Sequence, residues 1–246
     1  MNTAIILAGG TGSRIGADRP KQFLPVLGKP ILAYTLEVFQ NNRNIDAIEI
    51  VVHPDWVAEA EKIVRDYGVA KTRWITTGGA TFQDSVMRGL FRLKGELQRE
   101  DLAVISFGVS PMTTDAIIDD GLRVAALHGN AIASDPMVLC TCIKDTEESS
   151  VTPILRETLM GFANPWTFRF GEVLEAYETA LERGILGDLE PHTTSLYFAL
   201  GKRIWFSKSA TTNLKITTRE DLDIFEGLLL LREKRRREAG TGEEET

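Results

Sequence analysis

The sequence has little that would adapt it to an oxidising compartment or to resident metal ions. Only two of its 246 residues are cysteine, Cys140 and Cys142, and one residue separates them. Such a pair suits neither an ordinary disulfide nor a complete metal site, so we interpret both as free thiols in a reducing cytosol. The three histidines, His53, His128 and His192, show no metal-ligand spacing, and we assign no metal ligand to them.

Positive charge and long apolar runs are also scarce. The formal net charge is −7, which argues against a nucleic-acid binder driven by bulk charge but leaves room for a local basic pocket. No window approaches the roughly 18 consecutive apolar residues that a membrane-spanning helix needs, so we expect no membrane partner. The opening MNTAIILAGG has no basic segment before its short apolar run. We therefore expect no signal peptide and a cytoplasmic location.

What the chain does contain is hydrophobic residues, 43% of the total, in short runs that alternate with segments of helical period. We predict strands over 4–9, 45–53, 72–79 and 102–107, and helices over 30–42, 54–68, 84–94 (capped by Asp84) and 114–129. This alternation predicts a Rossmann-like α/β fold, with a mostly parallel twisted sheet and helices on both faces.

The segment 131–160 has a different character, with β-rich ends around the acidic turn DTEESS. We interpret it as an extended hairpin, a β-arm inserted into a single domain that covers 1–233. A helix over 171–184, a strand over 202–209 and a helix over 218–237 are predicted to follow.

The end of the chain is charged, and we predict a disordered tail over 234–246. The run REKRRR at 232–237 has two explanations, a nucleic-acid patch or a group of cations at a helix C-terminus. We favour the second, because the helix dipole stabilises cations at that end.

The most informative stretch is LAGGTGSRIGADRPKQF at 7–23, a glycine-rich bend followed by Arg14 and Lys21. Glycines let the backbone approach a ligand with its N–H groups facing it, and two cations beside such a bend suit a phosphate. It is not a Walker A loop, because no Gly-Lys-Ser/Thr follows, and a basic residue interrupts any dinucleotide fingerprint. On these residues alone, an ordinary turn with two solvated cations remains an alternative.

The longer string LAGGTGSRIGADRPKQFLPVLGKPIL resembles the opening of sugar- and polyol-phosphate nucleotidyltransferases. It is most similar to the cytidylyltransferases that act on 2-C-methyl-D-erythritol 4-phosphate or ribitol 5-phosphate. The similarity recurs in GGATFQDSVMRGL (78–90) and TTNLKITTREDLDIFEGLL (211–229), and so extends over nearly the whole chain. The resemblance implies a nucleotidyltransferase fold, a homodimer formed through the 131–160 arm, and CTP, a polyol phosphate and Mg²⁺ as reactants and cofactor.

The resemblance also implies roles for individual residues. Arg14 and Lys21 would neutralise the triphosphate and the charge that develops during transfer, and Lys215 would contact the reacting phosphates. Arg156 would reach the acceptor in the neighbouring subunit. The cytidine would be held at Leu7, Ala8, Gly9, Gly10, Gly12, Gly78, Gly79 and Ser85. Each of these residues has an ordinary alternative as a surface cation or a turn residue.

Several family positions carry different residues here. The family's His-Asp-Ala-Ala-Arg-Pro reads SFGVSP at 106–111, which puts Phe107 in place of a metal-binding aspartate, and the second such aspartate is matched by Thr212. Mg²⁺ takes oxygen ligands, so we assign no metal ligand. Ser110 replaces the arginine of the same motif, and Phe82 replaces the arginine after the second glycine pair. Two further family strings are replaced by PHTTSL at 191–196 and NPW at 164–166. The carboxylates that remain nearby in sequence are Asp101, Asp115 and Asp135.

Two functions therefore stay open. The first is a CTP-dependent cytidylyltransferase that transfers CMP to a polyol phosphate with release of pyrophosphate. The second is a catalytically impaired family member that acts as a nucleotide-binding, regulatory or partner module, which Phe107 and Thr212 suggest. We favour the first, because the nucleotide half of the site is retained.

Overall fold

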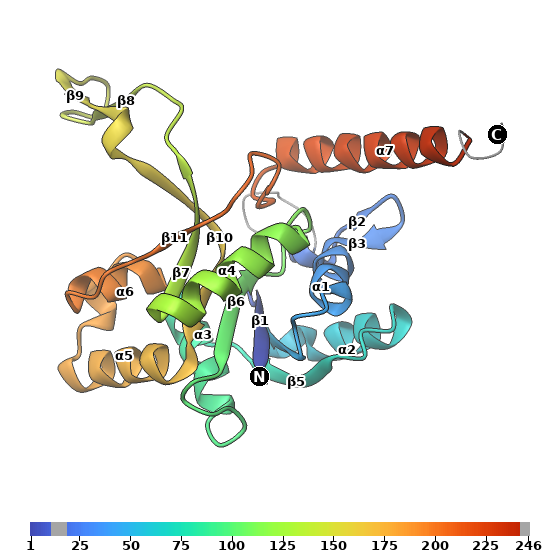
Figure 1. Ribbon diagram of the computed structural model, residues 1–246, viewed down its shortest axis with the longest axis horizontal. Helices are drawn as coiled ribbons and strands as arrows, with labels where there is room; N and C mark the ends of the chain where they lie inside the picture. Colours follow the sequence, from blue (N-terminus) through green and yellow to red (C-terminus); the bar gives the residue numbers. More distant parts are fainter. Residues whose placement is uncertain (11–18, 242–246) are drawn as a thin grey trace.

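The sheet is built around its first strand. A computed structural model describes residues 1–10 and 19–241 (Figure 1). In this part of the chain seven strands form one sheet, in the order β11-β7-β10-β6-β1-β4-β5. β1 (Asn2–Ala8) lies between β4 (Ala47–Val52) and β6 (Leu102–Phe107) and is parallel to both, and β5 (Thr72–Thr77) is parallel to β4.

The other half of the sheet contains a direction change. β10 (Met160–Arg169) runs antiparallel to both β6 and β7 (Asn130–Pro136), and β11 (Phe206–Ser207) pairs with β7 in parallel. The predicted mostly parallel α/β sheet is confirmed, and β10 is the antiparallel strand that sequence periodicity did not predict.

Both faces of the sheet are covered by helices, as predicted. Along β1, Ala4, Ile6 and Ala8 pack on one face and Ile5 and Leu7 on the other, which explains why this strand reads as a continuous apolar run. The first face is covered by α1 (Ile31–Asn41), α2 (Val57–Asp66) and α4 (Asp115–His128), and the second by α3 (Phe82–Arg92), α5 (Phe170–Arg183) and α6 (Thr193–Ala199).

Short elements connect these layers. They are η2 (Lys21–Phe23), β2 (Pro25–Val26), β3 (Lys29–Pro30), η3 (Pro54–Trp56), β8 (Thr141–Ile143), β9 (Thr152–Ile154), η4 (Arg156–Thr158) and η5 (Leu186–Asp188). None of the described helices is long and apolar enough to cross a membrane.

Helix α3 begins earlier than predicted, because its cap is Thr81 and not Asp84. The backbone N–H of Asp84 donates to Thr81 Oγ1 at 3.0 Å, and the Asp84 carboxylate accepts from the Thr81 N–H at 3.2 Å. This reciprocal pair is a capping box, in which the acidic residue occupies the third helical position.

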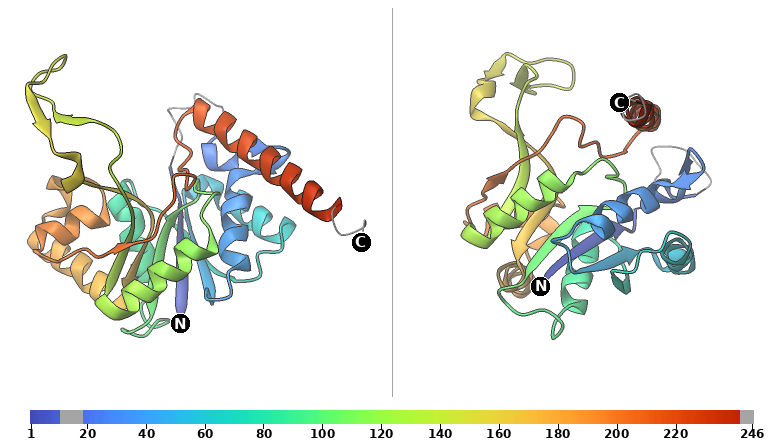
Figure 2. Two further views of the ribbon diagram at one scale, coloured as in Figure 1. Left: turned by 45° about the horizontal axis from the view of Figure 1, so that its top comes forward. Right: turned by 45° about the vertical axis from the view of Figure 1, so that its right-hand side comes forward.

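The arm is shorter than the predicted segment 131–160. Its first residues form β7, where Ala131 to Ser134 are buried between β10 and β11, and only β8, β9 and η4 project from the sheet (Figure 2). The predicted strand over 202–209 is likewise reduced to β11, and α6 was not predicted at all.

The final helix α7 (Arg219–Thr241) changes the interpretation of the chain's end. It continues through REKRRR and into the segment 234–246 that was predicted to be a disordered tail. Its last turn contains no basic residue, so the helix-dipole explanation of that basic run is wrong. Near its start, Phe225 packs edge-on against Tyr34, with ring centroids 5.2 Å apart, and the later turns project from the body (Figure 2).

Candidate functional site

A cavity of about 360 Å³, here called the first cavity, lies at the carboxyl ends of β1, β5 and β6. Ligands of open α/β sheets bind at this edge, outside the ends of the parallel strands. Leu7, Ala8, Gly9, Gly10, Lys21, Gly79, Ser85 and Lys215, all predicted site residues, line this cavity. The fold therefore brings together most of the residues that the sequence nominated from four separate segments.

The bend after β5 is shaped by Ser85. The Ser85 hydroxyl accepts from the Gly79 N–H at 3.1 Å and donates to the carbonyl of Thr81 at 3.0 Å. A Cβ on Gly79 would lie 2.2 Å from the Cβ of Asp84, so only glycine fits there. Gly78 is buried behind the bend and does not line the cavity. The Ser85 side chain thus supports the bend as well as facing the cavity.

Gln22 is a site residue that sequence reasoning missed. It is 2% exposed, and its Nε2 donates to the carbonyl of Ala8 at 2.6 Å and to that of Gly10 at 2.9 Å. These bonds fix the backbone where the glycine-rich loop leaves β1. The signal was present in the string PKQF, where the glutamine directly follows Lys21 at the start of η2.

A second cavity of about 400 Å³ adjoins the first. It is lined by Phe107, Phe162, Ala163, Asn164, Trp166, Glu190, His192, Thr194, Asn213 and Lys215. Phe107 and Lys215 line both cavities, and the Lys215 Nζ lies 3.8 Å from the centroid of the Phe107 ring. A cation resting on an aromatic ring therefore marks the boundary between the two cavities.

Four aromatic side chains from separate elements meet at this boundary. The centroid of the Phe107 ring lies 5.6 Å from the ring centroids of both Phe82 and Trp166. The centroid of the His192 ring lies 5.8 Å from the same two ring centroids. Phe82 and Trp166 are themselves 6.0 Å apart. All four rings belong to stretches where the sequence departs from the resemblance described above, and the fold packs them into one cluster. Thr212, another of those departures, lies outside it.

A polar network behind this cluster holds His192 in place. The Tyr177 hydroxyl donates to Gln83 Oε1 at 2.5 Å, and Gln83 Nε2 donates to the carbonyl of His192 at 3.1 Å. Burial raises the pKa of Tyr177, so its hydroxyl stays protonated as a donor. The three residues tie α3, α5 and the start of α6 together.

A second polar network forms the floor of the second cavity. Asn213 Nδ2 donates to the carbonyl of Asn164 at 2.5 Å, Ser106 Oγ donates to Asn164 Oδ1 at 2.8 Å, and Thr113 Oγ1 donates to Asn213 Oδ1 at 2.9 Å. All four residues are buried. Asn213 is thereby fixed two residues before Lys215, which limits where that lysine can reach.

The described residues do not match the donor set that Mg²⁺ takes. No described lining residue of the first cavity carries a carboxylate, and the second has Glu190 alone. Among residues 1–10 and 19–241, no group of three or more histidines, cysteines or acidic residues lies close enough to hold a metal. Phe107 presents a ring to Lys215 at the position where the sequence resemblance implied a metal-binding aspartate, and Mg²⁺ requires oxygen ligands.

The carboxylates nominated as substitutes lie elsewhere. Asp101 precedes β6, at the end remote from Phe107, and pairs with the amino group of Met1. Asp115 begins α4, and neither it nor Asp135 lines either cavity. Thr212, exposed in the segment before α7, also lies outside both linings.

Three further predicted residues lie outside this arrangement. Arg14 and Gly12 belong to residues 11–18, outside the described part of the chain. Arg156 lies on the arm, where its Nη1 donates to the carbonyl of Val138 at 3.0 Å, and it lines neither cavity of its own chain.

Glycines and lysines gathered at the carboxyl ends of parallel strands, as in the first cavity, are typical of proteins that bind a phosphate-bearing ligand. Residues 2–230 match the family of 2-C-methyl-D-erythritol 4-phosphate cytidylyltransferase. The chain belongs to this family of CTP-dependent polyol-phosphate cytidylyltransferases, which confirms the resemblance seen in the sequence.

Relatives with two different acceptors match at similar identity. The ribitol-5-phosphate cytidylyltransferase of Lacticaseibacillus paracasei is 32% identical over 229 residues, covering 93% of this chain and 98% of the relative. The 2-C-methyl-D-erythritol 4-phosphate cytidylyltransferase of Clostridium novyi is 34% identical over 230 residues, covering 93% and 96%. The crystal structure of the Anaerococcus prevotii 4-diphosphocytidyl-2C-methyl-D-erythritol synthase has the same fold, with a TM-score of 0.77, 21% identity and coverage of 94% and 98%.

Proposed function

We propose that the chain binds CTP in the first cavity and transfers its cytidylyl group to a polyol phosphate in the second. The observation that carries this proposal is the shared boundary, because Lys215 lines both cavities. A phosphate of each reactant can therefore meet the same cation. An oxygen of the acceptor phosphate forms a bond to the α-phosphorus, the bond from that phosphorus to the bridging oxygen breaks, and pyrophosphate leaves.

The retained residues support this reaction through position and charge. Phosphoryl-type transfer depends on alignment and on stabilising charge more than on covalent help. Lys21 lines the space proposed for the triphosphate, and Lys215 lines the boundary where the phosphates would react. Arg14 is proposed to add a second cation from the glycine-rich loop. The cytidine would lie against the bend formed by Gly79 and Ser85.

The ring cluster favours a second candidate, a nucleotide-binding or regulatory module without turnover. The Phe107 ring occupies the boundary where a family member would present a carboxylate, and it is packed between Phe82 and Trp166. A catalytic metal ion typically stabilises the transition state by several kcal/mol, and loss of the carboxylate that holds the metal would remove this stabilisation. Binding of CTP is common to both candidates.

Two measurements separate them. Calorimetric titration of CTP into the full chain, with and without Mg²⁺ and with ATP as the comparison, tests the first cavity. Pyrophosphate release from CTP with ribitol 5-phosphate or 2-C-methyl-D-erythritol 4-phosphate tests transfer. Lys21→Ala should abolish the signal in either assay, whereas Lys62→Ala, on the exposed face of α2, should leave both unchanged.

The outcomes are distinct. Pyrophosphate release that depends on an acceptor supports the transferase, and CTP binding without release across both acceptors supports the nucleotide-binding module. Absence of binding to either nucleotide would contradict both.

We further propose a homodimer formed through the arm. The arm exposes five large apolar side chains, Val138, Leu139, Ile143, Val151 and Leu155, each over more than half of its surface. Exposed apolar groups of this density are typical of protein interfaces. Arg156 on the same arm lines neither cavity of its own chain, which fits a role in the site of a neighbouring copy.

A further inference from the structure

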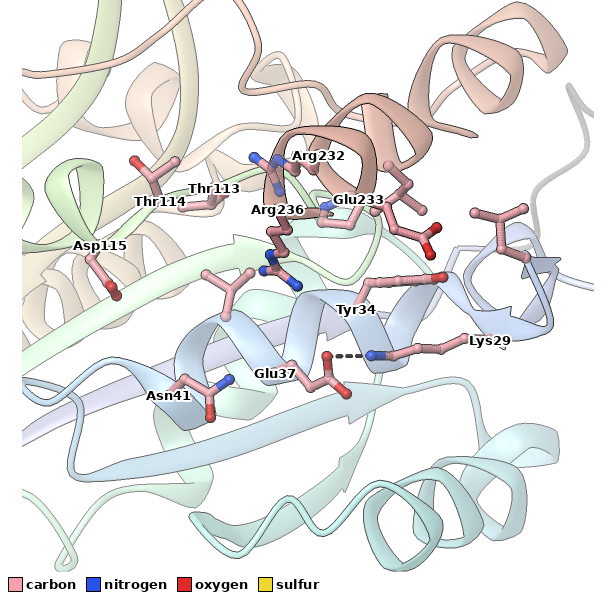
Figure 3. A pocket seen from close by; sticks show the side chains of 14 residues that line it. Lys29, Tyr34, Glu37, Asn41, Thr113, Thr114, Asp115, Arg232, Glu233 and Arg236 are labelled. Carbon is pink, nitrogen blue, oxygen red and sulfur yellow. Dashed lines mark ion pairs between the residues drawn. The ribbon is translucent and has the colours of Figure 1, made fainter. Parts of the chain in front are cut away.

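A cavity of about 640 Å³, here called the helix cavity, lies apart from the two cavities of the proposed active site. Its floor is α1, its wall is the start of α4 and its roof is α7 (Figure 3). It shares no lining residue with the first cavity or the second. Whatever it binds would therefore not compete directly for the proposed nucleotide space.

Two arginines of the REKRRR run on α7 line this cavity. Arg232 and Arg236 are one helical turn apart and both line the cavity. The Arg236 side chain extends toward α1, and the Arg232 side chain lies on the side of α7 nearer Thr113 and Thr114 (Figure 3). Neither forms a hydrogen bond or ion pair with another residue in the described part of the chain. Burial and the charge of Arg236 lower the pKa of Arg232. Like charges four residues apart destabilise a helix, and an anion bound between them would offset this repulsion.

The carboxylates around the cavity are already engaged. Glu37 pairs with Lys29, Glu233 pairs with Arg237, and Asp115 Oδ1 accepts from the side-chain amide of a neighbouring asparagine at 2.8 Å. None of the three makes an ion pair with either cavity arginine. The two guanidinium groups are thus left facing the cavity without a protein counter-ion among the described residues.

The opposite wall adds to the attraction for an anion. Helix α4 begins there at Asp115, and its cap residue Thr114 makes no side-chain cap hydrogen bond. The first N–H groups of a helix lack intrahelical partners and carry the positive end of the helix dipole. This end of α4 is a supporting feature, and the paired arginines are the primary one.

We propose that the helix cavity binds a small molecule through a phosphate or diphosphate group, with Arg232 and Arg236 as its principal ligands. The planar forks of two guanidinium groups match phosphate oxygens in a bidentate manner, and the cavity volume exceeds that of a single phosphate. The proposal concerns a site separate from the nucleotide space and does not rest on the proposed transferase activity.

Calorimetric titration of inorganic pyrophosphate at constant ionic strength tests the site. Because pyrophosphate also fits the proposed active site, the starting protein is the full chain with Lys21→Ala and Lys215→Ala. Pyrophosphate should still bind this protein, and adding Arg232→Ala and Arg236→Ala should weaken binding at least tenfold. Arg235→Ala, a neighbouring cation of α7 that does not line the cavity, is the matched control and should leave binding unchanged.

Either of two results would overturn the proposal: no pyrophosphate binding to the Lys21→Ala, Lys215→Ala protein, or equal binding after removal of both cavity arginines. Both arginine side chains are exposed, so the variants are expected to fold, and Arg232→Gln with Arg236→Gln offers a second pair of similar size. In an otherwise wild-type chain, Arg232→Ala with Arg236→Ala should bind CTP normally, which keeps this test distinct from failure of the proposed function.

Discussion

The ammonium group of Lys215 lies over the ring of Phe107, 3.8 Å from its centroid. A cation on a phenyl face is stabilised by about 0.5–2 kcal/mol, depending on how far it is desolvated. Here the contact orients a proposed phosphate-binding lysine at the boundary of two cavities. The sequence resemblance places a metal-binding aspartate at the position of this ring, so replacing Phe107 tests how the site depends on metal.

Phe107→Asp should make CTP binding dependent on Mg²⁺. The carboxylate would supply a hard oxygen ligand beside the proposed phosphates, which the described residues of the first cavity lack. Calorimetric titration of CTP with and without Mg²⁺ measures the effect. Phe107→Leu, which removes the ring without adding an oxygen, is the control. If the Phe107→Asp protein binds CTP equally well with and without Mg²⁺, a carboxylate at position 107 does not hold a metal ion beside the proposed phosphates.

Lys215→Met should weaken CTP binding roughly 10- to 100-fold, because a hydrogen bond to a charged group contributes about 1.5–3 kcal/mol. Methionine keeps much of the stem that packs on Phe107 but removes the charge. Lys202→Met is a matched control, since that ammonium group also lies near a ring, 5.9 Å from the centroid of Tyr197, but lines neither cavity. Equal losses in both variants would exclude a specific role for Lys215.

Substitution by alanine should affect protein stability differently at two glycines of the first cavity. At Gly79 the new Cβ would collide with Asp84, and overpacking of this kind costs about 1–3 kcal/mol or more. At Gly10 the Cβ would meet no atom within 4 Å, so stability should stay within about 0.5 kcal/mol while CTP binding weakens. Urea unfolding and calorimetry on both variants measure the two quantities. Similar stability losses would show that the bend after β5 is not sterically restricted.

Because the pKa of Glu49 is raised in the folded protein, the free energy of unfolding should fall as the pH rises. Burial in β4 raises its pKa from 4.5 to about 8, opposed in part by the hydrogen bond from Thr76. Between these pH values the folded state holds a proton that the unfolded state has lost, so stability falls by about 1.4 kcal/mol per pH unit. Above about pH 8 this contribution becomes constant.

Glu49→Gln removes the titrating group and should flatten that slope. Urea unfolding of both proteins between pH 5 and 8 measures it, and the comparison concerns the slope and not the absolute stability. Parallel slopes would indicate that another group is responsible.

The arm is expected to hold two copies of the chain together. Val151→Asp with Leu155→Asp places charges on its exposed apolar surface and should convert a dimer into a monomer at micromolar concentration in sedimentation experiments. Leu181→Asp, on α5 and 46% exposed, is the control and should not change the mass. A monomeric wild-type chain would remove both the dimer and the proposed role of Arg156.

The local features of this protein follow from runs of neighbouring residues. Apolar runs and glycine or proline boundaries place β1, β4, β6 and the helices α1 and α4 to within a few residues, because period and chain breaks are properties of neighbouring residues. The glycine-rich loop and Lys21 were recognisable for the same reason. The continuous strands also indicated a sheet buried on both faces.

Contacts between residues that are distant in the chain depend on how the elements pack. Phe82, Phe107, Trp166 and His192 form one cluster because β10 pairs antiparallel with β6, a strand order that no local pattern encodes. The same applies to Arg232 and Arg236, which the sequence analysis interpreted as cations at a helix end but which line a cavity between α7, α1 and the start of α4. Periodicity reports which face of an element is buried, whereas contact between elements depends on the packing of the whole chain.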